Sequence, residues 1–205
     1  MSRGVSLPSL IAICVFAAAL AIPASANTKP IRVTVVGDSV AASLHQVPSA
    51  QTALRKGLEV RLDLEVFRRL VQPSCAFKGA TPSTALQAVR ASGRSLGRVL
   101  VVDVGYNEEP QGYGAGIDQV MHAALAQGVR GVVWVTLRER HGSYRRTNIA
   151  IMAAATRWPQ VLVADWNVYS AGKPWFRGDG VHMGATGATA FAAFLRPHIF
   201  RAAAS

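Results

Sequence analysis

The sequence predicts an α/β protein, a three-layer α/β/α sandwich around a five-stranded parallel sheet. Two observations predict this fold. Short, mainly apolar runs alternate along the chain with segments that have helical periodicity. Most of the runs lack an apolar–polar alternation, as expected for parallel strands that are covered on both faces. Because β-α-β crossovers are almost always right-handed, the helices should then form a layer on each face of the sheet.

Five segments are expected to form the strands. The second segment alternates apolar and polar residues, which is typical of a half-buried strand at the edge of a sheet. The other four are dominated by valine, leucine and isoleucine, which favour buried strands. In chain order the five segments are 31–36, 58–66, 99–104, 132–137 and 161–164.

Helices are expected in the intervening segments and after the last strand. Pro48 should divide the first of them into two short pieces, because proline lacks the N–H that a helix interior needs. Thr81 and Pro82 suit the N-cap and the first position of the second helix. The last helix should end before Pro197. The expected helices are 40–56, 81–91, 116–126, 147–158 and 185–195.

The first 26 residues are typical of a secretory signal peptide. Arg3 supplies a positive start, residues 10–22 form an apolar core, and residues 24–26 are a small-residue cleavage site. Cleavage would leave residues 27–205 as one domain that is secreted, periplasmic or held at the cell envelope, without a stable membrane anchor. The alternative is an uncleaved anchor, which the short apolar core disfavours.

The chain is basic, with 22 Lys and Arg against 11 Asp and Glu and a formal net charge of +11. On an exported protein this charge can attract an anionic cell envelope, acidic glycans or nucleic acid, or can simply maintain solubility. No long basic run is present, and no nucleic-acid partner is expected. The five histidines lack zinc-type spacing and no phosphate-binding Gly-Lys motif occurs, so neither a metal nor another cofactor is expected.

Cys75 is the only cysteine after residue 26. No intrachain disulfide can therefore form in residues 27–205, and the fold must depend on its apolar core. A lone cysteine of this kind is more often a small buried apolar residue than a reactive thiol. We therefore expect Cys75 to be buried.

Polar residues follow several of the expected strands at their carboxyl ends. Ser39 follows the first strand, residues 105–107 follow the central strand, and residues 138–146 and 166–182 follow the last two. Because parallel strands end at the same edge of a sheet, these segments should lie on one rim, where open α/β sheets carry their functional groups. The sequence therefore places the expected site at this rim.

Serine, imidazole and carboxylate groups are available at that rim. Asp179 and His182 lie three residues apart on a glycine-containing loop, so the carboxylate can hold one ring nitrogen while the other acts as a base. Ser39 could then be the nucleophile of an acyl transfer, with its own N–H and the Asn107 amide stabilising the oxyanion. Each of these residues also has a non-catalytic interpretation. Ser39 could be a helix cap, Asn107 a turn residue, and Asp179 with His182 a surface pair that has no catalytic role.

Three motifs in this order resemble blocks of the SGNH hydrolase superfamily, the GDSL-like esterases and lipases. The resemblance spans nearly all of residues 27–205 and implies a flavodoxin-like sheet. It also implies Ser39 as nucleophile, His182 as base, Asp179 as the group that orients the base, and Ser39 with Asn107 in the oxyanion hole. The motifs are Gly37-Asp38-Ser39-Val40, Gly105-Tyr106-Asn107-Glu108 and Asp179-Gly180-Val181-His182.

The chain also departs from the family pattern. Val40 ends the first block, as in the SGNH domains of cell-wall O-acetyltransferases, and Glu108 replaces the usual aspartate of the third. The second-block glycine, whose N–H would complete the oxyanion hole, has no clear match, and Gly79 is the remaining candidate. A Gly-Arg-Ser-Leu-Gly sequence at 93–97 fits the elbow of α/β-hydrolases, but it follows a helix and should lie in a loop at the opposite rim.

These observations predict an exported serine esterase that hydrolyses acetyl or short-chain acyl esters through an acyl-enzyme. The expected substrate is a small-molecule or carbohydrate ester, preferably on a cell-envelope glycan. One alternative keeps the same site but passes the acyl group to a glycan hydroxyl. Another is a basic envelope-binding protein that keeps the fold without catalysis, and the unmatched second block supports it.

Overall fold

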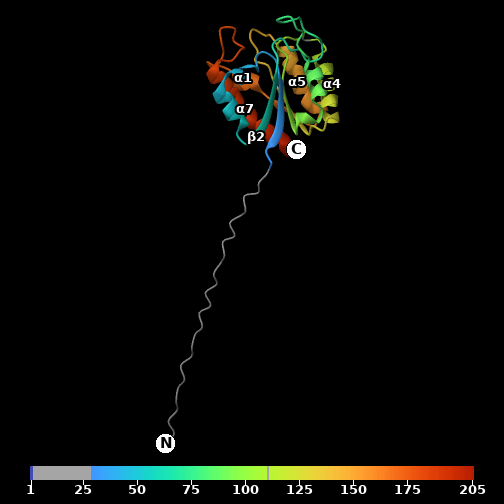
Figure 1. Ribbon diagram of the computed structural model, residues 1–205. Coiled ribbons are helices and arrows are strands. Elements are labelled where there is room, and N and C mark those ends of the chain that lie inside the picture. The colour runs from blue at the N-terminus through green and yellow to red at the C-terminus, as the bar shows by residue number, and fades with distance from the viewer. Residues whose placement is uncertain (2–28, 110) are drawn as a thin grey trace.

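The computed structural model describes residues 1, 29–109 and 111–205. Five strands form one parallel sheet in the order β2-β1-β3-β4-β5, and helices cover both faces of it (Figure 1). This arrangement confirms the predicted three-layer fold and its flavodoxin-like strand order. The predicted signal peptide, apart from Met1, lies outside the described residues and stays a prediction. Within the part of the chain that is described, no helix is long and apolar enough to cross a membrane.

β3 and β4 are buried along their whole length, whereas β2 alternates buried and exposed residues over its first four positions. β2 occupies one edge of the sheet, as its alternating pattern predicts, and β5 occupies the other. β1 lies between β2 and β3 and ends level with both, because its Gly37 pairs with Leu64 of β2 and with Asp103 of β3. The strands are β1 (Ile31–Gly37), β2 (Leu58–Leu64), β3 (Val99–Asp103), β4 (Gly131–Val135) and β5 (Val161–Ala164).

Alternate residues of each strand point to opposite faces, which builds two separate cores. Val33 and Val35 of β1 pack with one group of helices, whereas Val36 packs with the other. The first face is covered by α1 (Ser43–Gln46), α2 (Pro48–Arg55) and α7 (Ala185–Ala204). The second face is covered by α3 (Ala85–Ser92), α4 (Tyr113–Ala126) and α5 (Arg145–Arg157).

The first helix is divided as predicted, but the start of α3 differs from the prediction. Thr84, not Thr81, is the N-cap of α3. Its side chain accepts a hydrogen bond from the Gln87 N–H at 3.1 Å, and the Gln87 side chain accepts one from the Thr84 N–H at 2.9 Å. This reciprocal capping box satisfies two N–H groups. Thr81 could not form one, because the residue three positions after it is Thr84 rather than a glutamine or glutamate.

The predicted end of the last helix is also wrong. α7 continues through Pro197 to Ala204. A proline inside a helix costs about 3 kcal/mol. The turns that follow bury Ile199, Ala202 and Ala203 against the first face of the sheet. Burial of one isoleucine contributes roughly 1.5–3 kcal/mol, so this packing offsets the penalty at Pro197.

Two short helical segments were not predicted. α6 (Trp166–Tyr169) begins at Asp165, whose carboxylate accepts a hydrogen bond from the Val168 N–H at 3.2 Å. Residues Gly93–Leu96 form a 3₁₀ helix, η1, between α3 and β3. The Gly-x-Ser-x-Gly sequence is therefore an ordered turn, and it lies at the amino ends of the strands, at the rim opposite Ser39.

Candidate active site

Ser39 lies at the carboxyl end of β1, where the strand enters the turn before α1. Gly37 ends the strand in a tightly packed position, since a Cβ there would collide with the Cβ of Ala41. The chain can therefore turn sharply only with glycine at this point. Within the described residues, no protein acceptor takes the N–H of Ser39, so this donor is free to meet a developing oxyanion.

The Asp38 carboxylate ties the Ser39 turn to the neighbouring strand. It is fully buried and accepts hydrogen bonds from the N–H groups of Val40, Gly105 and Tyr106 at 3.0–3.1 Å. Burial raises the pKa of Asp38 to about 6, although these hydrogen bonds and the nearby His182 act to lower it. The first and third motifs thus meet at one buried group, at the point between β1 and β3 where the strand order changes direction.

Asp179, His182 and Ser39 form a continuous chain of contacts. Asp179 Oδ2 lies 2.7 Å from His182 Nδ1, and His182 Nε2 lies 3.1 Å from Ser39 Oγ. The other carboxylate oxygen of Asp179 accepts hydrogen bonds from the N–H groups of Val181 and His182, both at 2.9 Å. Partial burial raises the pKa of Asp179, but these hydrogen bonds lower it below its ordinary value overall. An ionised Asp179 holds a proton on Nδ1 and leaves Nε2 to accept the Ser39 hydroxyl.

Two arginines from the segment after β4 hold the Asp179 loop in place. Arg138 donates to the carbonyls of Gly180 and Ser170 at 2.8 and 2.9 Å, and its guanidinium stacks on the Phe176 ring at 3.9 Å. Arg140 packs against Gly180, whose φ of 76° favours glycine. The basic segment at 138–146, expected at this rim from the sequence, is thus partly a structural clamp for the Asp–His loop.

Asn107 follows β3 and reaches the loop after β2. Its side-chain amide donates one hydrogen bond, at 3.2 Å, to the carbonyl of Arg68. A primary amide has a second N–H, and no hydrogen bond within the described residues uses it. Glu108, which replaces the usual aspartate, binds the same loop: it accepts a hydrogen bond from the Leu70 N–H and lies 3.6 Å from Arg69 Nε.

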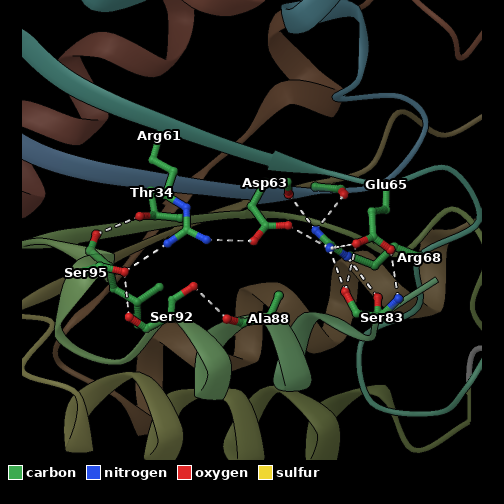
Figure 2. Close-up of polar contacts among 11 residues, drawn as sticks. Thr34, Arg61, Asp63, Glu65, Arg68, Ser83, Ala88, Ser92 and Ser95 are labelled. Carbon is green, nitrogen blue, oxygen red and sulfur yellow. Dashed lines mark hydrogen bonds and ion pairs between the residues drawn. The ribbon is translucent and has the colours of Figure 1, made fainter.

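Arg68 is a buried organising residue that sequence reasoning missed. Its side chain is fully buried, and its guanidinium contacts the carboxylates of Asp63 and Glu65 at 2.7 and 3.0 Å. It also donates to the carbonyl and hydroxyl oxygens of Ser83 and to the carbonyl of Gly37. Figure 2 shows Arg68 between these side chains of β2 and the loop 65–84. The loop is thereby fixed to the end of β1, two residues before Ser39.

This loop also contains Cys75, which the sequence predicts to be buried, and Gly79, the candidate oxyanion donor. Cys75 is exposed, so the expectation of a buried thiol was wrong: the loop lies on the surface and packs through Leu70 and Arg68 instead. Gly79 has φ of 83° in an exposed turn closed by Phe77 and Ala80, with no atom near its Cβ position. Its role as an oxyanion donor stays a prediction.

No protein-family model and no curated protein matches the sequence. Several solved structures, however, match this chain in fold. The C-terminal catalytic domain of peptidoglycan O-acetyltransferase A from Streptococcus pneumoniae, described with a methylsulfonyl adduct, matches with a TM-score of 0.65 and 23% identity, over 84% of this chain and 94% of that chain.

Two esterase structures match over a similar part of this chain. A family two carbohydrate esterase from Cellvibrio japonicus has a TM-score of 0.61 and 13% identity, over 85% of this chain and 62% of that chain. An arylesterase from Agrobacterium tumefaciens has a TM-score of 0.60 and 15% identity, over 83% and 97%. The chain has the SGNH hydrolase fold.

The SGNH resemblance is therefore confirmed for the fold, whereas the roles of individual residues depend on the geometry of this chain. That geometry provides a serine hydroxyl, an imidazole and a carboxylate in contact, together with a Ser39 N–H that no acceptor within the described residues takes. Asn107 follows the neighbouring strand β3. Such a set can carry out nucleophilic attack on an acyl carbon. Among the described residues, no group of three or more His, Cys, Asp or Glu is arranged to hold a metal ion.

Proposed function

We propose that this chain is an exported serine esterase that hydrolyses acetyl or short acyl esters, with Ser39, His182 and Asp179 as its catalytic residues. The continuous contact from Asp179 Oδ2 through the His182 ring to Ser39 Oγ carries the proposal. A hydroxyl alone is a weak nucleophile, and an imidazole within hydrogen-bond distance is what activates it.

The reaction follows from these positions. Ser39 Oγ attacks the ester carbonyl carbon while His182 Nε2 takes the hydroxyl proton, and Asp179 stabilises the imidazolium. The carbonyl oxygen becomes an oxyanion that accepts hydrogen bonds from the Ser39 N–H and the Asn107 amide. The C–O bond to the alcohol then breaks, His182 returns the proton to the leaving oxygen, and an acyl-Ser39 remains. Water activated by His182 releases the acid and restores Ser39.

The openness of the site favours an ester group presented by a larger molecule. The side chains of His182 and Asp179 are 39% and 47% exposed, so an acyl group on an extended glycan can reach Ser39 without entering a deep channel. The similarity to a carbohydrate esterase and to a peptidoglycan O-acetyltransferase supports an ester on a carbohydrate. An acetylated cell-envelope glycan is the substrate that fits these observations best.

A transferase is the second candidate. The first motif ends in Val40, as in the SGNH domains of cell-wall O-acetyltransferases, and one of the similar structures is such an enzyme. The acyl-enzyme would be the same in both reactions. The difference lies in the second step, in which a glycan hydroxyl, rather than water, attacks the acyl carbon.

Covalent labelling tests the proposed nucleophile. Purified protein would be treated with methanesulfonyl fluoride or a fluorophosphonate, and the adduct located by peptide mass spectrometry. We expect one adduct, on Ser39, which is lost in Ser39→Ala and kept in Ser95→Ala. Ser95 is the matched control because it lies in the Gly-x-Ser-x-Gly sequence but has no histidine partner: its hydroxyl contacts Ser92 and Arg61.

If the folded protein takes no label on Ser39, both proposed enzymatic functions, hydrolysis and transfer, are wrong. The non-catalytic envelope-binding alternative is then favoured. If Ser39 is labelled, the products formed from an activated acetate ester with and without an oligosaccharide acceptor separate the two reactions. Acetate as the main product in both cases supports hydrolysis. Acetylated oligosaccharide as the main product supports transfer.

A further inference from the structure

A cleft of about 730 Å³ lies at the amino ends of the strands, at the end of the sheet opposite Ser39. It is formed by the start of β1, the segment from η1 to β3 and the turn between α4 and β4. Five cationic side chains line it, and all five residues are exposed. They are Lys29, Arg32, Arg94, Arg98 and Arg130, and we call this site the basic cleft.

The positive charge of the basic cleft is not neutralised by the protein. Glu59 is the only carboxylate side chain that lines it, and none of the five cations forms an ion pair within the described ranges 29–109 and 111–205. Like charges gathered in one cleft repel one another, and a bound anion would relieve that repulsion. Arg32 and Arg98 each donate a hydrogen bond to a backbone carbonyl, whereas the side chains of Arg94, Arg130 and Lys29 donate none within these ranges and are therefore more available.

The chemistry of the lining favours phosphate groups. Four of the five cations are arginines, whose planar guanidinium binds phosphate through two parallel hydrogen bonds. Several cations along one cleft suit a chain with repeated anionic groups better than a single ion. The described lining residues include no aromatic side chain, whereas proteins that bind single-stranded nucleic acid stack its bases on aromatic rings.

We propose that the basic cleft binds a flexible polymer that carries repeated phosphate groups and no nucleobases. β1 extends for seven residues from the cleft to Gly37, a distance of about 20 Å at the usual rise of a strand. A polymer held in the cleft therefore leaves Ser39 free to meet an ester on another part of the envelope. This inference concerns a site separate from the proposed active site and does not require esterase activity.

Direct binding measurements test the proposal. Fluorescently labelled inorganic polyphosphate would be titrated with purified protein at about 0.15 M salt, where the Debye length is about 8 Å. Polyglutamate, single-stranded DNA and phosphatidylglycerol vesicles would be further arms. We expect polyphosphate to bind more tightly than polyglutamate or DNA. The double variant Arg94→Gln/Arg130→Gln should bind polyphosphate on the order of tenfold more weakly, as expected when two cations are removed from an anionic contact.

A charge-matched control separates the cleft from general attraction to a basic protein. Arg145 and Arg146 are exposed at the start of α5, at the other end of the molecule, and Arg145→Gln/Arg146→Gln removes the same charge. It should keep the wild-type affinity within about twofold, since distant surface charges are largely screened. Ser39→Ala should bind polyphosphate as the wild type does, so failure of the esterase proposal would not affect this result.

Equal weakening in the two double variants would overturn the assignment to the cleft. Tighter binding of DNA than of polyphosphate, or binding to vesicles without binding to polyphosphate, would overturn the proposed ligand class. Circular dichroism of each variant would show that the fold is retained, and a variant of Lys29 alone, Lys29→Gln, provides a second and milder test of the same site.

Discussion

The two ends of the parallel sheet use charge in opposite ways. At the carboxyl end, two charged groups are buried and bonded: Asp38 accepts hydrogen bonds from three N–H groups, and Arg68 contacts two carboxylates. At the amino end, the five cations of the basic cleft are exposed and lack ion pairs within the described residues. The comparison indicates that these buried charges fix the geometry of the candidate active site, whereas the exposed charge at the amino end remains available to a partner.

Loop length explains why the two ends differ. The connections at the carboxyl end include the long segments 65–84 and 170–184, whereas the amino-end connections 127–130 and 158–160 are short. Long connections can fold over one another and bring distant residues into contact, but they need internal bonds to hold one conformation. Arg68 and Arg138 supply those bonds. The short amino-end turns need none, and their cations can stay solvated.

The largest expected effect belongs to the carboxyl end. Asp179→Asn should lower turnover of an activated acetate ester by about 10³- to 10⁴-fold, because the amide no longer holds the required His182 tautomer. Asp118→Asn is the matched control, since Asp118 is also a partly exposed aspartate with a side-chain partner, here Arg157, but lies on α4, away from Ser39. Turnover of Asp179→Asn close to that of the control would contradict the role of Asp179.

Arg68 should have the next largest effect, on stability. Arg68→Met would leave Glu65 without its cation and Asp63 with only Arg61, at 3.6 Å, and should lower the free energy of unfolding by about 3 kcal/mol. Arg68→Lys keeps the charge but loses the planar fork, so it should lose less. Urea unfolding measures both, and turnover of the folded variants shows whether Asn107 is displaced. A loss under about 1 kcal/mol in Arg68→Met would mean that this cluster does not hold the loop.

The sequence predicts the groups of the candidate site better than it predicts the residues that hold them in place. Parallel strands end at one edge, so the convergence of Ser39, Asn107 and His182 follows from strand order alone. The role of Arg68 does not, because it also depends on Ser83 and Gly37, which lie 15 and 31 residues away along the chain. Pro197 shows the same limit: its local preference ends a helix, and tertiary burial of the following turns overrides it.

A smaller effect, dependent on pH, is expected at the buried acid beside the active site. Asp103 ends β3 and is almost fully buried, and burial, together with the charge of Asp38, raises its pKa well above the ordinary value. A pKa raised in the folded state means that the folded protein loses stability as pH rises through that pKa. Asp103→Asn carries no titrating proton, so its stability relative to wild type should increase between pH 5 and pH 8.

Urea unfolding at the two pH values measures this difference. Asp118→Asn again serves as a control with the opposite sign, because its side-chain partners lower the pKa of Asp118 overall despite partial desolvation. The stability that this lowered pKa contributes is present above pH 4 and should hardly change between pH 5 and pH 8. If the stability of Asp103→Asn relative to wild type falls as the pH rises, the pKa of Asp103 is not raised in the folded state and the prediction is wrong.

The smallest effect on stability is expected at the amino end, and it sharpens the contrast with Arg68. Arg94→Gln/Arg130→Gln should change the free energy of unfolding by no more than about 0.5 kcal/mol, because neither guanidinium bonds to the described part of the protein. Polyphosphate should raise the melting temperature of the wild type, since a ligand that binds only the folded state stabilises it, and should raise that of the variant much less. A large loss of stability without any ligand would instead mean that these cations support the fold. The two ends of the sheet would then use charge in the same way.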